Sequence, residues 1–290
     1  MKQTKKGLRI LLILIAIVCL LGAIILTAKY LIQDRQNEEQ LNKYRSEAES
    51  PPTLQPTAEP LPEATPVADT SPEPTPVPTE TPEPTPAPIP NPYAEAYSDN
   101  SDMVGWLVIP GTNVDYPVMW TPGDENYYLY RGFDGSENAN GCLLLDTDSS
   151  LEPLTTNLII HGHNMKSGAM FGNLTDYEDE EYFREHRQII LHTETCQRNY
   201  EIIAVFRSQV YKKTDDVFKF YKFFQANTQE EFDDFYNNIK ALSLYDTGVN
   251  AEFGDRFITL STCVYHVTNG RFVVVAKEVE PGDTYLPIVN

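Results

Sequence analysis

A proline-rich segment limits which parts of this chain can fold. Sixteen of the 22 prolines lie between Pro51 and Pro92, in stretches such as SPEPTPVPTE and TPEPTPAPIP. Proline has no backbone N–H and a fixed φ, so a segment so rich in it builds neither helix nor sheet. Extended as polyproline II at about 3.1 Å per residue, it would reach on the order of 130 Å. We predict a spacer over residues 51–92, which also fits an O-glycosylated stalk, and one folded domain over residues 93–290.

An uncharged apolar run precedes the spacer. Residues 10–28 consist mainly of Leu, Ile, Val and Ala. At 1.5 Å per residue they would span roughly 28 Å, close to the hydrocarbon core of a bilayer. We predict a cytoplasmic tail over 1–9, a single membrane-spanning helix over 10–28 and a juxtamembrane segment over 29–50, with the remainder outside the cell. A cleaved signal peptide ending near Ala28 is the alternative. The positive-inside rule supports the orientation, since four basic residues precede the run: Lys2, Lys5, Lys6 and Arg9.

The charge of the folded part excludes one class of partner. Residues 93–290 contain 14 basic and 31 acidic side chains, a formal net charge of −17. Such a domain repels phosphate backbones, so we predict no nucleic-acid binding. Outside the apolar run the chain has three cysteines, Cys142, Cys196 and Cys263. An odd number leaves at least one free thiol and argues against a complete disulfide framework.

The domain is rich in short segments of Val, Ile, Leu and Thr bounded by Gly, Pro, Asn and Asp, which predicts a closed barrel or a sandwich. One helix is clearly signalled, because Thr228 and Glu231 form a capping box ahead of apolar residues at helical spacing up to residue 244. Weaker patterns predict helices over 93–101 and 215–224. The predicted strands are 106–109, 114–119, 142–146, 157–161, 188–193, 199–207, 256–263 and 272–279.

Three residues could form a nucleophilic site. Cys263 ends the segment Thr-Leu-Ser-Thr-Cys, where a strand end can expose its thiol at the rim of a barrel. A cysteine attacks as thiolate, so it needs a base or a cation nearby. His163 follows a strand in His-Gly-His163-Asn, and Arg271 opens the strand after Cys263. A cysteine within a strand is more often a small buried hydrophobe, which is how we interpret Cys142 and Cys196.

The chain between Cys263 and Arg271 tests this interpretation. Asn269-Gly270 is a strong signal for a two-residue hairpin turn. Such a turn would pair Cys263 with Ala276 and place Arg271 on the opposite face of the sheet. A site that uses both side chains therefore requires the strand to end at Cys263. We predict that residues 264–270 form a loop, with Asn-Gly as a turn inside it.

Together these motifs, behind a membrane anchor and a spacer, resemble the sortase family over residues 93–280, and class B most. The resemblance implies a mostly β fold: a closed eight-stranded β-barrel with an N-terminal helix and a long helix inserted before the last two strands. It also implies a cysteine transpeptidase without cofactor or metal. Cys263 would be the nucleophile, His163 the acid/base and Arg271 the group that holds the substrate or the oxyanion. Ser261, Asn140 and Leu144 match positions of the substrate groove.

The resemblance further implies the partners and the location. The substrates would be surface proteins bearing a C-terminal sorting motif, and the acceptor an amine of peptidoglycan or of its lipid-linked precursor. The enzyme would sit in the cell membrane of a Gram-positive cell, with its catalytic domain outside. The alternatives are a hydrolytic cysteine peptidase of the cell wall, a pilin-polymerising sortase, and a non-enzymatic anchored β-barrel adhesin.

Two sets of residues raise the question of a metal. His161 precedes His163 by two residues, which suits a zinc pair, but no third ligand is evident. The acidic run over 176–181 could bind calcium, although such a run is more often a solvated helix face. We therefore predict no metal site.

Overall fold

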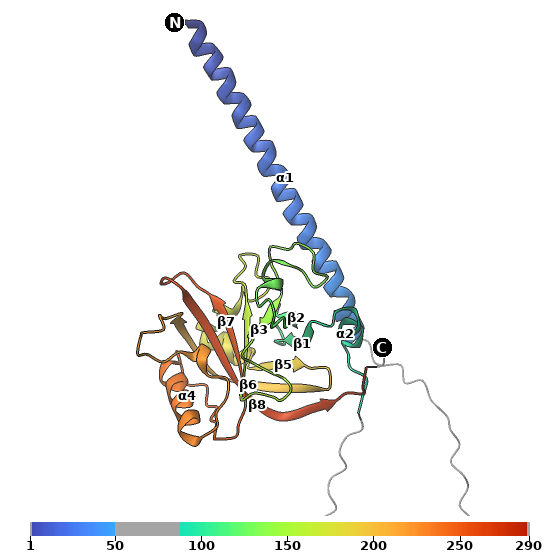
Figure 1. The fold of residues 1–290 in the computed structure, drawn as a ribbon, viewed down its shortest axis with the longest axis vertical. Helices are drawn as coiled ribbons and strands as arrows, with labels where there is room; N and C mark the ends of the chain where they lie inside the picture. Colours follow the sequence, from blue (N-terminus) through green and yellow to red (C-terminus); the bar gives the residue numbers. More distant parts are fainter. Residues whose placement is uncertain (1, 50–87, 289–290) are drawn as a thin grey trace, which may run out of the picture.

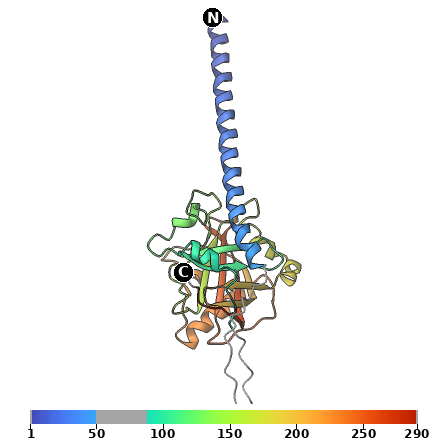
Figure 2. The ribbon, with the colours of Figure 1, turned by 90° about the vertical axis from the view of Figure 1, so that its right-hand side faces the viewer.

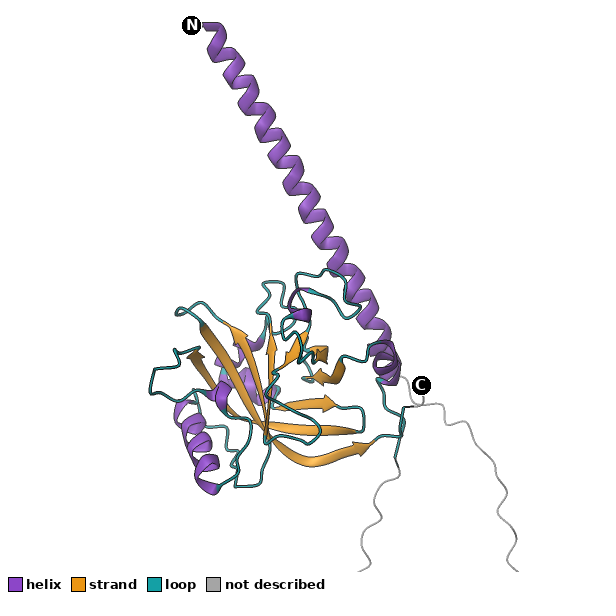
Figure 3. Ribbon diagram, viewed as in Figure 1, coloured by secondary structure: helices purple, strands orange, loops and turns teal. Residues whose placement is uncertain are grey.

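The computed structural model describes residues 2–49 and 88–288, so residues 51–87 of the predicted spacer lie outside it. Eight strands close into one barrel in the order β1-β2-β3-β4-β7-β8-β6-β5 (Figures 1 and 3). Two neighbouring pairs, β2 with β3 and β4 with β7, are parallel, and the others are antiparallel. The predicted closed eight-stranded barrel is confirmed. Its strands are β1 (Met103–Val108), β2 (Asp115–Met119), β3 (Leu143–Leu145), β4 (Asn157–Gly162), β5 (Gln188–His192), β6 (Cys196–Gln209), β7 (Phe257–Cys263) and β8 (Gly270–Thr284).

The clearly signalled helix of the domain is present, and so is one of the two helices predicted from weaker patterns. Helix α2 (Ala94–Asp99) precedes the barrel, and α4 (Gln229–Leu242) lies between β6 and β7. The Thr228 hydroxyl accepts a hydrogen bond from the Glu231 backbone N–H, and the Glu231 carboxylate accepts one from the Asn227 N–H. Thr228 thus caps α4 as predicted, and the Glu231 carboxylate reaches back to the N–H of the residue before the cap. The remaining short helices are α3 (Glu180–Glu185), η1 (Tyr127–Tyr130), η2 (Leu174–Glu178) and η3 (Phe220–Lys222).

The helix predicted over 215–224 is wrong. Only the single 3₁₀ turn η3 forms there. The segment that follows is held extended beside the start of β4, because the Asn157 backbone N–H donates to the Phe224 carbonyl and its side-chain amide to the Phe223 carbonyl. Phe220 packs on the barrel and is buried. These tertiary contacts outweigh the weak helical pattern.

Alternation along β7 and β8 produces two different faces. Leu260, Phe272 and Val274 point into the barrel and join the main core. Val273 and Val275 point outward, into a second apolar cluster that α4 covers with Phe232, Phe235 and Ile239. Helix α4 covers only part of this outer face. The end of β7 at Cys263 and the start of β8 at Arg271 lie beyond it, and Cys263 is exposed to solvent.

Helix α1 (Lys2–Ala48) is one continuous helix that leaves the barrel (Figures 1 and 2). Its first part is apolar, with a mean hydropathy of 2.7 over an 18-residue window of which nothing is buried, and it is the one candidate membrane span among the described residues. Its last turns pack on the barrel through Leu41 and Tyr44, both buried in the main core. Residues 29–48 of the predicted juxtamembrane segment therefore continue this helix.

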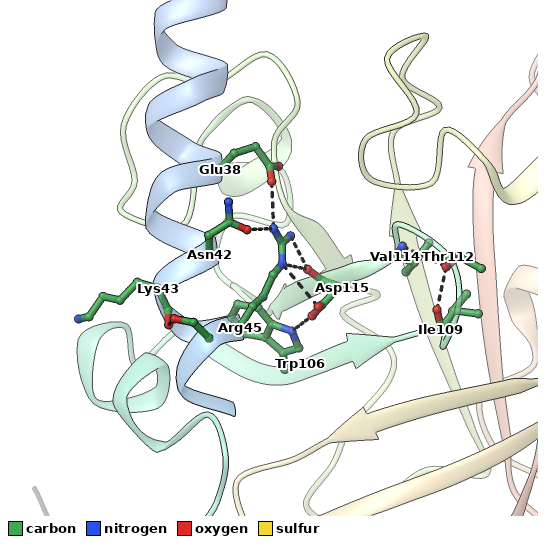
Figure 4. A network of polar contacts seen from close by, with 10 residues as sticks. Glu38, Asn42, Lys43, Arg45, Trp106, Ile109, Thr112, Val114 and Asp115 are labelled. Atoms are coloured by element: carbon green, nitrogen blue, oxygen red, sulfur yellow. Dashed lines mark hydrogen bonds and ion pairs between the residues drawn. The ribbon is translucent and has the colours of Figure 1, made fainter. Parts of the chain in front are cut away.

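Polar contacts secure the same end of α1 (Figure 4). The Arg45 guanidinium donates to the Asp115 carbonyl oxygen from Nη2 at 2.6 Å and from Nε at 3.0 Å. The Tyr44 hydroxyl donates to Asp99 at 2.7 Å. Because the last turns of α1 contact the barrel directly, the distance from the apolar part of α1 to the barrel is set by the helix. The length of the spacer does not set it.

Candidate active site

The β7–β8 connection brings Cys263 and Arg271 together. The two residues are direct partners in the antiparallel ladder, so both side chains lie on the outer face of the barrel. Strand β7 ends at Cys263, and β8 begins at Gly270. Asn269 has a φ of 58°, and the Gly270 N–H donates to the Val267 carbonyl at 3.1 Å. The predicted loop, with its Asn-Gly turn, is therefore confirmed.

Parallel pairing of β4 with β7 carries the His163 loop to the same edge. His161 lies beside Ser261 and Gly162 beside Thr262, so the chain leaving β4 enters the site next to Cys263. The Thr262 hydroxyl donates to the Gly162 carbonyl at 2.7 Å. The Asn164 side-chain amide donates to the Cys263 carbonyl at 2.9 Å, which ties the two strand ends together.

A cavity of about 470 Å³ opens at this edge of the barrel. Cys263, His163 and Arg271 all line it, so the structure brings the three predicted catalytic residues together. Ser261 and Leu144 line it too, which places two of the three predicted groove residues there. The Ser261 hydroxyl is buried at 2% exposure and has no hydrogen-bond partner within the described part of the chain.

The cysteines differ in their access to solvent. Cys263 is exposed, while Cys142 is buried and Cys196 is partly buried, and all the described cysteines are unpaired. Burial raises the pKa of the Cys142 thiol well above its ordinary value, which makes that thiol inert at neutral pH. Accessibility therefore distinguishes Cys263 from the other thiols of the barrel.

A backbone carbonyl orients His163. Its Nε2 lies 2.8 Å from the Leu129 carbonyl oxygen. A carbonyl can only accept a hydrogen bond, so Nε2 carries the hydrogen and Nδ1 of the neutral ring is left as the acceptor. The Tyr130 ring lies beside the imidazole, with centroids 5.4 Å apart. Leu129 was not among the residues singled out from the sequence, and a main-chain carbonyl 34 positions away leaves no signature in a motif.

Residues 127–142, which we call the wall loop, form the side of the cavity that contains Leu129 and Tyr130. Asn140 belongs to this loop but does not line the cavity; it is fully buried, and its side chain contacts α1. Gly141 adopts a φ of 60°, and a Cβ there would come within 2.3 Å of the Leu129 carbonyl oxygen. The backbone of the loop therefore packs tightly behind the group that binds His163.

His161 forms a second polar pair in the cavity wall. Its Nε2 lies 3.0 Å from an Asp146 carboxylate oxygen. Burial acts to raise the pKa of Asp146, but the bond to His161 and a backbone N–H from Asp148 outweigh it, so this pKa lies below its usual value. His161 and His163 thus face different partners. Within residues 2–49 and 88–288 no group of three or more His, Cys, Asp or Glu side chains is arranged to hold a metal ion.

Comparisons with known proteins agree with this geometry. A sequence model of the sortase domain matches residues 107–279. Sortase B of Listeria monocytogenes is 35% identical over 180 residues, which cover 61% of this chain and 70% of that protein. The structure of sortase B from Bacillus anthracis in complex with AAEK1 superposes with a TM-score of 0.56 at 31% identity, covering 65% of this chain and 84% of that one.

A Staphylococcus aureus sortase B–substrate complex superposes with a TM-score of 0.59 at 26% identity, covering 67% of this chain and 87% of that one. The family match over residues 107–279 therefore covers most of the barrel, including β7 and the part of β8 that carries Arg271. This chain belongs to the sortase family, within class B.

Proposed function

We propose that this chain is a membrane-anchored transpeptidase that cleaves a C-terminal sorting motif and transfers the acyl group to an amine. The observation that carries this proposal is the register of β7 and β8, which sets Cys263 directly opposite Arg271 in a cavity shared with His163. Nucleophile, base and cationic donor then face one site, which acyl transfer requires.

The first half-reaction forms a thioester. Nδ1 of His163 takes the thiol proton, and the Cys263 sulfur attacks the carbonyl carbon of the scissile amide. Charge develops on the carbonyl oxygen, where the fixed guanidinium of Arg271 stabilises it. Within the described chain Arg271 has no carboxylate partner and donates only to the Asn269 and Gly270 carbonyls, so its charge is available. The C–N bond breaks as the His163 imidazolium protonates the leaving amine.

The second half-reaction forms a new amide. An acceptor amine attacks the thioester carbonyl, His163 Nδ1 takes the amine proton, and the Cys263 thiolate leaves. Ser261 and Leu144 line the groove in which the sorting motif lies. Asn140 was also predicted as a groove residue, and that role stays a prediction.

Helix α1 supports an acceptor attached to the membrane. With the basic residues 2–9 in the cytoplasm, the barrel lies outside the cell. Tyr30, which contacts the wall loop, is only two residues past the apolar run that ends at Ala28. At 1.5 Å per residue that loop lies on the order of 3–10 Å beyond the run. The cavity is thus within reach of the amine of a lipid-linked peptidoglycan precursor.

The experiment compares transfer with hydrolysis. Full-length protein in lipid nanodiscs is incubated with a panel of sorting peptides and amines, and the products are identified by mass spectrometry. We expect a thioester on Cys263 and an amide product that requires the amine. Hydrolysed peptide alone would indicate a cell-wall peptidase, and joined surface-protein segments a pilin polymerase. If no peptide of the panel acylates Cys263, the enzymatic proposal fails in favour of an adhesin.

A further inference from the structure

Asn140 connects α1 to the wall loop of the active site. Its side-chain oxygen accepts a hydrogen bond from the Tyr30 hydroxyl at 3.3 Å, and its side-chain nitrogen donates to the Asp34 carboxylate. Tyr30 and Asp34 are four residues apart and therefore lie on the same face of α1. Asn140 has no solvent exposure, so these two bonds are the partners that replace water for its amide.

The wall loop transmits this contact toward the catalytic histidine. The Asn138 N–H donates to the Tyr130 carbonyl at 3.0 Å, and the Cys142 N–H donates to the Tyr128 carbonyl at 3.0 Å. These two bonds hold the chain around Asn140 alongside Leu129. Between them Gly141 packs directly against the Leu129 carbonyl oxygen.

The Leu129 carbonyl is the group that orients His163. Four contacts therefore link α1 through Asn140 and Gly141 to the Leu129 oxygen and the imidazole. Orienting the base through its second ring nitrogen is a recurring requirement of nucleophilic sites, usually met by a carboxylate or amide side chain. Here the orienting group is a main-chain oxygen, so its position depends on whatever holds the loop.

We infer that Tyr30 and Asp34 of the membrane helix, acting through Asn140, are positioning residues for His163. This inference rests on the proposed function. It assigns to the extracellular turns of α1 a part in the chemistry of the site as well as in anchoring. It also gives Asn140 a different role from that of a groove residue, and the two roles predict different kinetics.

Alkylation of Cys263 tests the inference without knowledge of the sorting motif. Full-length protein in lipid nanodiscs is treated with iodoacetamide between about pH 5 and 9. The rate at Cys263 is read from its own peptide by mass spectrometry, because the chain has other thiols. The bond from Nε2 to the Leu129 oxygen leaves Nδ1 as the ring nitrogen that can take the Cys263 proton. The test variants are Asn140→Ala and the double variant Tyr30→Phe with Asp34→Ala.

We expect both variants to slow alkylation at neutral pH by about threefold to tenfold, the net effect of one hydrogen bond, and to move the acid limb of the profile. The kcat of transfer should fall by a similar factor with KM unchanged. Asp34→Asn keeps an acceptor for the Asn140 amide and should retain the wild-type profile. Tyr44→Phe is the matched control, because it removes a bond from α1 to Asp99 away from the wall loop.

Three outcomes would overturn the inference: profiles of the test variants that match wild type, a rise in KM alone, or an equal shift in Tyr44→Phe. A rise in KM alone in Asn140→Ala would instead make Asn140 a substrate contact. Failure of the proposed function has a different signature. In that case Cys263 of the wild type would react with iodoacetamide no faster than a free cysteine does at the same pH, whatever the variants do.

Discussion

The outer face of β7 and β8 is used in two different ways along its length. At one end Val273, Val275 and Phe257 are covered by α4, and the surface is a sealed apolar core. At the other end Cys263 and Arg271 carry no covering helix and face the cavity. Both ends obey the same alternation of side chains. The difference shows that one continuous pair of strands can provide stability at one end and reactivity at the other, with the position of α4 dividing the two.

Removing the nucleophile at the open end should have the largest effect on activity. Cys263→Ala should lower kcat/KM for transfer by at least about a thousandfold, since the thioester can no longer form. The thiol is exposed, so the melting temperature should stay within a few degrees of wild type. Peptide transfer assays and thermal denaturation measure the two effects. A retained acyl adduct in this variant would show that another residue is the nucleophile.

The corresponding change at the covered end should do the opposite. Phe235 is buried and packs edge-on against Phe257 at 5.3 Å between ring centroids. Phe235→Ala should lower the free energy of unfolding by about 3–5 kcal/mol, because it removes aromatic burial and leaves a cavity. Urea denaturation measures this loss. Activity per correctly folded site should change little. A large fall of kcat in the folded fraction would contradict the view that the covered end of β7 and β8 provides stability alone.

The chemistry of the open end can be tested with a conservative replacement. Arg271→Lys keeps the charge but loses the planar fork, so kcat should fall by about a hundredfold as for the loss of one oxyanion donor. The free energy of unfolding should hardly move, because among the described residues Arg271 donates only to the adjacent Asn269 and Gly270 carbonyls. Steady-state kinetics on the thioester step provides the measurement. A wild-type kcat in the lysine variant would show that the guanidinium of Arg271 makes no bidentate contact with the substrate in the transition state.

The smallest expected effect lies at the start of α4. Thr228→Ala removes the hydroxyl that accepts the Glu231 N–H at 3.2 Å. The free energy of unfolding should fall by about 1 kcal/mol. Thr228→Ser restores the acceptor and is the matched control. Transfer kinetics should be unchanged in both, and an effect of Thr228→Ala on kcat would mean that the covered end communicates with the open one.

Most of the barrel and part of the site could be predicted from local patterns in the sequence. Short β-rich segments, the capping box at Thr228 and the motifs around Cys263, His163 and Arg271 depend on residues close together in the chain. The loop after Cys263 was predicted from one requirement, that the Cys263 and Arg271 side chains lie on the same face of the sheet. Residues 215–224 show where such reasoning fails, since a helical pattern there lost to hydrogen bonds from Asn157 in β4.

Residues close together in the chain were thus enough to predict the apolar helix, the strands, the free thiol and the candidates for catalysis. Tertiary structure alone decided that α1 packs on the barrel, that Asn140 binds Tyr30 across 110 positions, and that the Leu129 carbonyl meets His163. The physical reason is the kind of group involved. Main-chain carbonyls occur at every residue and buried amides satisfy whatever lies nearest, so only the closed fold selects which of them become partners.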